Sequence, residues 1–150
     1  MVVTSRASYA RIRTVLAAIR DREDLELVII GAASLLLFRF GDAVDVMRRD
    51  GFEIADRVYM LVEGENPTTM AKSVGLGIIE LAAIFDRCRP DIVLSVADRF
   101  ETIATAISAS YLNIPVAHVQ GGEITGSIDE KVRHAVTKLS SLHFVANERA

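Results

Sequence analysis

Two short polar stretches, each following an apolar run, carry side chains suited to proton transfer or anion binding. Asp98 and Arg99 come soon after the run Ile92–Val96. A carboxylate at a strand end can serve a ligand as an acid or a base, and a guanidinium can grip a phosphate through two parallel hydrogen bonds. Two alternatives stay open: the side chains pair with each other, or Asp98 caps a following helix over Phe100–Leu112.

The segment from His118 to His134 is the richest in such groups. Three carboxylates fall within eight residues and are candidate catalytic groups: Glu123, Asp129 and Glu130. Arg133 lies four residues after Asp129, so a plain ion pair on a helix surface is an alternative role for both.

An adjacent glycine pair, Gly121 and Gly122, permits a tight turn and a close approach of a ligand to the backbone. His118 and Gln120 precede this pair and are candidate substrate-binding residues. A histidine inside an apolar strand is also common as a hydrogen-bonded core residue. The three histidines show no zinc-site spacing, so no metal is expected.

Arg6 comes just after the expected strand Val2–Thr4 and precedes a helical pattern. A guanidinium beside the free N–H groups of a helix N-terminus suits a phosphate or diphosphate. The alternative is a solvated arginine on a loop. Neither GxGxxG nor a Walker loop occurs, so dinucleotide and P-loop interpretations lack their main support.

Short β-rich runs alternate with amphipathic stretches along the whole chain. The expected strands are Val2–Thr4, Leu25–Ile30, Ile54–Met60, Asp91–Val96, Pro115–Val119 and Leu142–Ala146. The expected helices are Ser8–Arg20, Ala43–Asp50, Pro67–Arg87, Phe100–Leu112 and Ile128–Leu139. This alternation predicts an α/β fold with a doubly wound, mostly parallel sheet, in which ligands bind beyond the carboxyl ends of the strands.

Composition supports a buried parallel sheet and excludes several classes of partner. The 150 residues are 51% hydrophobic with few aromatic side chains, which suits strands covered on both faces. This length predicts one domain over residues 1–150. The net charge of -3, with scattered Lys and Arg, argues against nucleic acid. A single cysteine, Cys88, suits a reducing cytoplasm, and we expect no membrane partner because no apolar run reaches about 18 residues.

These motifs resemble the signature of the hydrolysing UDP-N-acetylglucosamine 2-epimerases. The most specific part is the Gly-Gly-Glu segment within Val116–Glu130, which continues into Arg133–Leu139. Further similarity lies in Thr4–Tyr9, Val62–Glu65 and Asp98–Phe100, so it covers nearly the whole chain. Such enzymes serve bacterial sialic-acid and legionaminic-acid pathways, and the epimerase half of a bifunctional animal enzyme is similar.

The resemblance implies the Rossmann-like N-terminal half of a glycosyltransferase-B-type fold, with the family's second domain absent from this chain. It implies loss of UDP from UDP-N-acetylglucosamine, or a related UDP-2-acetamido sugar, to give a glucal. Water addition then yields N-acetylmannosamine or the related sugar. Arg6 and Arg99 would contact UDP, Asp98 and Asp129 would transfer protons, and Glu123 and Glu130 are weaker additions. No cofactor is implied, and a homo-oligomer, dimer or tetramer, is expected.

Some positions depart from the family pattern. Ala97 replaces the glycine usual before the Asp-Arg pair, Ser95 stands where histidine is common, and Gln120 is neutral where some relatives place glutamate. These changes leave the sugar substrate open. Two alternatives remain: a non-catalytic nucleotide-sugar-binding domain, and the donor domain of a glycosyltransferase-B-type transferase.

Overall fold

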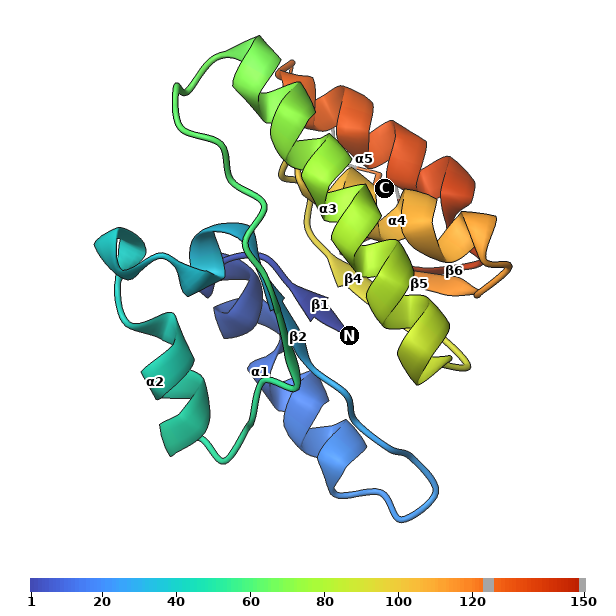
Figure 1. Ribbon diagram of the computed structural model, residues 1–150. Coiled ribbons are helices and arrows are strands. Elements are labelled where there is room, and N and C mark those ends of the chain that lie inside the picture. Colours follow the sequence, from blue (N-terminus) through green and yellow to red (C-terminus); the bar gives the residue numbers. More distant parts are fainter. Residues whose placement is uncertain (123–125, 149–150) are drawn as a thin grey trace. The chain divides into compact units, whose positions relative to one another are not determined.

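The computed structural model describes residues 1–122 and 126–148 (Figure 1). The chain divides into two compact units, Met1–Tyr59 and Met60–Ala150, called unit 1 and unit 2 below. Each unit contains its own three-stranded sheet, and every strand pairing in both sheets is parallel. The predicted α/β class with parallel pairing is therefore confirmed, and the single domain over residues 1–150 stays a prediction.

Unit 1 is built around a sheet with the strand order β1-β2-β3. Its elements are β1 (Val2–Val3), α1 (Arg6–Arg20), β2 (Ile30–Ala32), the 3-10 helices η1 (Ala33–Leu36) and η2 (Phe38–Phe40), α2 (Ala43–Arg49) and β3 (Asp56–Val58). The strand predicted over Leu25–Ile30 begins only at Ile30, because its ladder to β1 starts with the pair Val2–Ile30. The two 3-10 helices were not predicted from the sequence.

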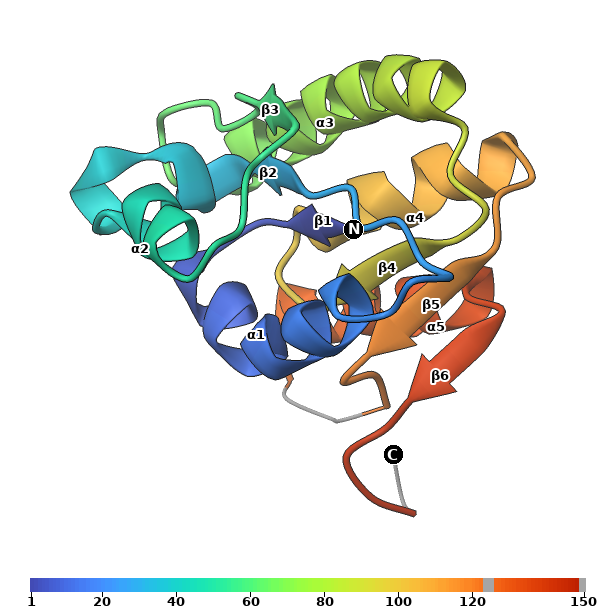
Figure 2. The ribbon, with the colours of Figure 1, turned by 90° about the horizontal axis from the view of Figure 1, so that it is seen from below.

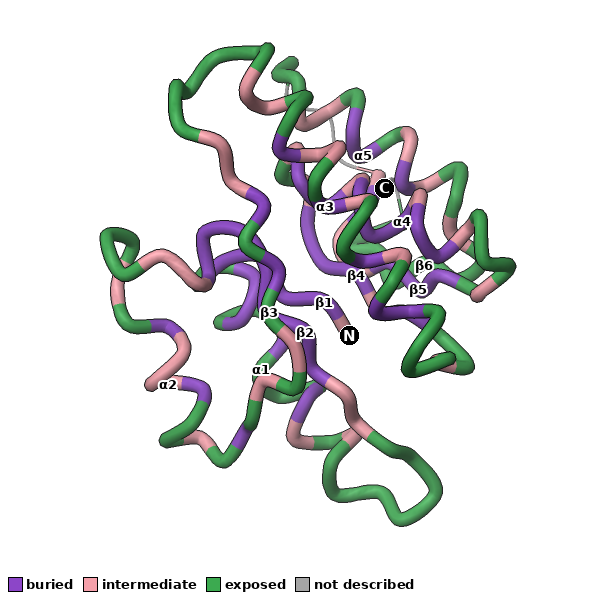
Figure 3. The backbone as a smooth tube through the Cα atoms, viewed as in Figure 1, coloured by how far each residue is buried: buried purple, intermediate pink, exposed green. Residues whose placement is uncertain are grey.

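Unit 2 carries most of the predicted site residues. Its elements are α3 (Pro67–Cys88), β4 (Val93–Val96), α4 (Thr102–Tyr111), β5 (Val116–Val119), α5 (Ile128–Leu139) and β6 (Leu142–Phe144). Strands β4, β5 and β6 lie side by side in that order (Figure 2). Helix α4 packs against both α3 and α5. The strands β4 and β5 are largely buried, whereas all three residues of β6 are exposed (Figure 3).

Helix α3 begins at the predicted residue and ends one residue later than predicted. The Asn66 side chain accepts a hydrogen bond from the Thr69 N–H, and the Thr69 hydroxyl accepts one from the Asn66 N–H. Pro67 occupies the first helical position. The helix ends at Cys88, and its C-cap Arg89 adopts a left-handed conformation with φ 43° immediately before Pro90. Local capping chemistry therefore fixes both ends of this helix.

Helix α3 is also long and apolar enough to cross a membrane by length and composition alone. The core helix of a soluble protein meets the same criterion, and α3 buries Gly77, Leu81 and Phe85. The absence of a membrane partner stays a prediction.

Candidate functional site

Three strands end in a residue with left-handed backbone geometry, which turns the chain sharply. Ala33 follows β2 with φ 52°, Ala97 follows β4 with φ 63°, and Gln120 follows β5 with φ 70°. This conformation costs a residue with a Cβ atom about 1–2 kcal/mol. The geometry at Ala97 explains why glycine suits that position. The strain lies at strand ends, where ligands are expected.

Asp98, just after β4, is held by a side chain from α5. The Arg133 guanidinium donates a hydrogen bond to Asp98 Oδ2; the Arg133 side chain is 1% exposed and that of Asp98 27% exposed. The pair fixes the carboxylate at the strand end while leaving part of its surface accessible. Because Arg133 is buried, the alternative of a plain surface pair with Asp129 is wrong.

The two alternatives for Asp98 are also wrong. Asp98 pairs with Arg133 rather than with Arg99. Helix α4 begins at Thr102, two residues later than predicted, and its N-cap is Glu101. Residues Phe100 and Glu101 form a turn instead, with the Thr102 N–H bonded to the Arg99 carbonyl. The turn separates Asp98 from the helix, so this carboxylate cannot cap it.

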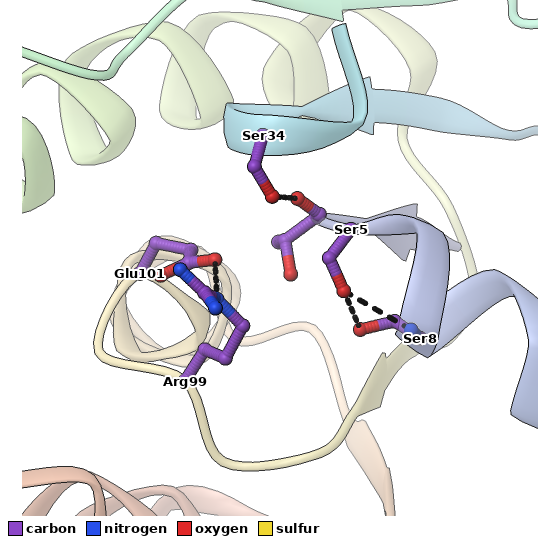
Figure 4. A network of polar contacts seen from close by, with 6 residues as sticks. Ser5, Ser8, Ser34, Arg99 and Glu101 are labelled. Carbon is purple, nitrogen blue, oxygen red and sulfur yellow. Dashed lines mark hydrogen bonds and ion pairs between the residues drawn. The ribbon is translucent and has the colours of Figure 1, made fainter. Parts of the chain in front are cut away.

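Arg99 and Glu101 form the second ion pair of this segment (Figure 4). Arg99 Nε donates to Glu101 Oε1 at 2.8 Å. The Arg99 side chain is 49% exposed, whereas the Glu101 side chain is fully buried. Burial raises the pKa of Glu101; the Arg99 charge opposes this, and the charge of Asp129 adds to it. Sequence reasoning missed Glu101, because neither its residue type nor its place two residues after Arg99 indicates that the side chain is buried.

The His118 ring lies inside unit 2. Its Nδ1 is 2.7 Å from the Ser95 hydroxyl oxygen, and the two residues are directly paired across β4 and β5. Burial lowers the pKa of His118 to about 4; His143 adds to this lowering, and the bond to Ser95 opposes it. The ring is therefore neutral near pH 7. This geometry fits the core-histidine alternative, and a contact with the sugar stays a prediction.

The turn Gln120-Gly121-Gly122 packs closely against the His118 ring. The Gln120 N–H donates to the Phe144 carbonyl at 2.8 Å, and Gly122 has φ 86°. A Cβ atom on Gly121 would lie 3.0 Å from His118 Cδ2 and 3.2 Å from Thr137 Oγ1. Only glycine fits here without displacing a neighbour, so the ring and α5 together set the path of the turn.

Asp129 and Glu130 lie in the first turn of α5, where the helix dipole favours negative charge. Ser127 caps the helix by accepting from the Asp129 N–H at 3.2 Å. The Glu130 carboxylate accepts from the Gly126 N–H, and its Oε1 is 3.8 Å from His134 Nε2. Glu130 therefore has a structural role at the helix start. Glu123 lies outside the described residues.

Arg6 belongs to unit 1, whereas the other described site residues belong to unit 2. It is exposed and is the first residue of α1. Ser5 caps this helix through bonds to the Ser8 N–H at 3.0 Å and the Ser8 hydroxyl at 2.8 Å (Figure 4). Ser34 Oγ donates to the Thr4 carbonyl at 3.0 Å. A guanidinium at a helix N-terminus retains the geometry that suits a phosphate.

Acid–base and anion-binding groups thus lie at the ends of β4 and β5 and at the start of α5. Among the described residues, no cluster of three or more His, Cys, Asp or Glu side chains could hold a metal ion. The described arrangement offers proton transfer from carboxylates and electrostatic binding of an anion by arginine.

Comparison with known proteins relates the chain to one group of enzymes. A family model described as UDP-N-acetylglucosamine 2-epimerase matches residues 17–150. The UDP-N,N'-diacetylbacillosamine 2-epimerase (hydrolyzing) of Legionella pneumophila is 39% identical over 147 residues, which are 98% of this chain and 39% of that protein. The GDP/UDP-N,N'-diacetylbacillosamine 2-epimerase (hydrolyzing) of Campylobacter jejuni is 31% identical over 149 residues, 99% of this chain and 38% of that protein.

Solved structures show the same fold. The UDP-GlcNAc 2-epimerase of Neisseria meningitidis bound to UDP-GlcNAc matches with a TM-score of 0.85 and 20% identity, over 98% of this chain and 40% of that chain. The UDP-GlcNAc 2-epimerase of Methanocaldococcus jannaschii in complex with UDP-GlcNAc and UDP matches with a TM-score of 0.84 and 20% identity. The match covers 99% of this chain and 40% of that chain. The predicted glycosyltransferase-B-type α/β fold is confirmed. The chain spans about two fifths of the length of these relatives.

Proposed function

Because the chain belongs to the UDP-N-acetylglucosamine 2-epimerase family, we propose that it is the N-terminal domain of a hydrolysing 2-epimerase acting on a UDP-2-acetamido sugar. The observation that carries this proposal is the end of β4. There a partly exposed carboxylate, Asp98, is fixed by the buried Arg133, and the half-exposed Arg99 follows directly. Elimination of a nucleoside diphosphate needs a base for the proton and a cation for the leaving group.

The proposed reaction has two steps. A carboxylate, Asp98 or Asp129, takes the proton from sugar C2 while the bond from C1 to the UDP oxygen breaks, which leaves a C1–C2 double bond. The electron pair departs with UDP, whose charge Arg99 stabilises. Water then adds its hydroxyl group to C1, and a proton returns to C2 on the opposite face. The products are UDP and the 2-epimeric free sugar, so no cofactor is needed.

The substrate class includes UDP-N-acetylglucosamine and its 2,4-diacetamido analogue. A relative named for UDP-N,N'-diacetylbacillosamine is 39% identical to the chain, whereas a Neisseria meningitidis relative named UDP-N-acetylglucosamine 2-epimerase is 30% identical. These values favour the diacetamido sugar as the first substrate to test. Its product would enter a legionaminic-acid-type pathway, as N-acetylmannosamine enters a sialic-acid pathway.

The test uses a two-domain protein, in which residues 1–150 are joined to the second domain that the family implies. Each UDP sugar is supplied in D₂O, and UDP release and the free sugar are measured. An active hydrolysing epimerase releases UDP and forms the 2-epimer with deuterium at C2. A binding domain releases no UDP, and a transferase releases it only when an acceptor is added. Either of these two outcomes refutes the proposal.

We also propose a cytoplasmic homo-oligomer. On α3, Leu76 is 43% and Ile79 67% exposed. An apolar pocket of about 400 Å³ lies at the same helix, lined among others by Met70, Phe100 and Ile128. Exposed apolar surface of this kind favours association. The free, exposed thiol of Cys88 suits a reducing compartment. Light scattering of the two-domain protein tests the assembly, and a monomer would refute it.

A further inference from the structure

Glu101 is a buried carboxyl group that serves neither as a helix cap nor as a surface charge. It occupies the N-cap position of α4, yet its side chain makes no capping hydrogen bond. The side chain is fully buried, and its Oε2 atom has no hydrogen-bond partner among the described residues. Burying a carboxyl group with one oxygen unsatisfied is costly. Helix stability therefore does not account for this residue.

The one side chain that engages Glu101 by a hydrogen bond is Arg99, within the part of the chain that the structure describes. The bond joins Arg99 Nε to Glu101 Oε1 at 2.8 Å (Figure 4). It uses the inner nitrogen of the guanidinium, and half of the arginine side chain remains exposed. A guanidinium is planar and presents its donors in a rigid fork. Fixing Nε therefore also fixes the plane in which Nη1 and Nη2 lie.

We propose that Glu101 is a positioning residue, which holds the Arg99 guanidinium so that its outer nitrogen atoms are presented to the diphosphate of the nucleotide sugar. The inference rests on the proposed function, since Arg99 is the predicted diphosphate ligand. Glu101 itself cannot touch a substrate because it is fully buried. It acts by removing the rotational freedom that a half-exposed arginine would otherwise lose on binding. Burial raises the pKa of Glu101, and the charge of Arg99 opposes this, so the two side chains interact electrostatically as well as through the hydrogen bond.

A double-mutant cycle on UDP affinity tests this inference. Isothermal titration of the two-domain protein with UDP is carried out for the parent, Glu101→Gln, Arg99→Ala and the double variant. Glutamine keeps the shape and an acceptor for Nε but loses the charge, which halves the strength of such a bond. We expect Glu101→Gln to weaken UDP binding roughly fivefold and Arg99→Ala to weaken it about tenfold or more. In the Arg99→Ala background, Glu101→Gln should have no further effect on UDP affinity.

The outcomes separate the inference from the proposed function. A parent that binds no UDP removes both. A parent that binds UDP and a Glu101→Gln variant with unchanged affinity remove only the inference. The inference is also refuted if Glu101→Gln weakens UDP binding equally in the parent and in the Arg99→Ala background, because a merely structural role of Glu101 persists in both. If thermal denaturation shows that Glu101→Gln does not fold, Glu101→Asp replaces it in the cycle. Aspartate keeps the charge but reaches less far toward Arg99. A Glu101→Asp variant that binds UDP with parental affinity would refute the positioning role.

Discussion

The Asp98 carboxylate accepts a hydrogen bond from Arg133, and in the proposed reaction it is also a candidate base. Replacement by Asn leaves an oxygen that can accept from Arg133, but an amide could not serve as the base that the proposed reaction requires. We therefore expect Asp98→Asn in the two-domain protein to lower kcat by about 10²–10⁴. Thermal unfolding should show a folded protein. Asp86→Asn, at an exposed carboxylate on α3, is the matched control and should keep parental turnover. An Asp98→Asn variant with more than a third of parental turnover would contradict the assignment.

His118 should make stability depend on pH. Its pKa is about 4 in the folded protein and about 6.5 when unfolded. Between these values the unfolded chain binds more protons, so the stability that the neutral ring contributes is present above pH 6.5. It is lost as the pH falls toward 4, by up to about 1.4 kcal/mol per unit. The raised pKa of Glu101 acts in the opposite sense, because its contribution is lost as the pH rises.

The comparison of parent and His118→Asn isolates this residue from Glu101. Urea denaturation at pH values from 4 to 7 gives the unfolding free energy of each protein. The difference between the two should shrink as the pH falls, since asparagine does not titrate. Parallel curves over the whole range would mean that the buried ring does not titrate in this window.

At the residue scale, the sequence predicted positions better than partners. The polar segments after two apolar runs correctly located Asp98, Arg99 and Gln120 at strand ends. The partner of Asp98, Arg133, lies 35 residues later, on helix α5. A single sequence shows how far apart residues are along the chain but not in space. It therefore suggested partners close in sequence, Arg99 for Asp98 and Asp129 for Arg133. Glu101 was missed because burial, rather than residue type, sets it apart.

At the scale of elements, α3 offers a test of helix packing in two glycines that lie two residues apart. A Cβ atom on Gly77 would lie 3.0 Å from the Ala104 Cβ of α4 and would also meet the Met60 methyl group, whereas one on Gly75 would meet nothing within 4 Å. Met60 can move, but Ala104 Cβ is fixed to the α4 backbone. We expect Gly77→Ala to destabilise the protein by about 1–3 kcal/mol. Gly75→Ala should stabilise it by about 0.5–1 kcal/mol.

Chemical denaturation of the two variants beside the parent measures this contrast. Equal and small effects of both substitutions would show that α3 and α4 do not pack as closely as the structure has them. Because the two positions share one helix, a difference between them reports packing rather than helix propensity.

Most elements were predictable from local chemistry, and their boundaries were predicted better for helices α3 and α5 than for strand β2. Helix α5 has the predicted bounds Ile128–Leu139, and α3 differs from its prediction by one residue. Strand β2 is shifted, since the pairing with β1 rather than local β propensity decides where the ladder starts. The 3-10 helices η1 and η2 were missed because their irregular turns carry no periodic pattern.

For the whole molecule, the class of fold followed from sequence and the division into two units did not. Apolar runs without alternation predicted parallel strands covered by helices, and both sheets are parallel. The two units, residues 1–59 and 60–150, are defined by the contacts within each range. A single sequence shows hydrophobic periodicity but not which distant residues are in contact. The composition is uniform along the chain and contains no linker-like segment, so nothing in it pointed to Tyr59.

Residues 1–150 alone should fold but should not turn over substrate. Each unit has its own parallel sheet and buried residues, so circular dichroism should show cooperative unfolding. The chain spans about two fifths of the length of its relatives. Under the proposed function, a second domain would supply the other wall of the substrate cleft. Without that wall, no fixed substrate lies beside Asp98, and positioning accounts for about 7–11 kcal/mol of barrier lowering. UDP release is measured for residues 1–150 with and without the second domain added in trans. Robust release by the short chain alone would mean that a complete site exists within it.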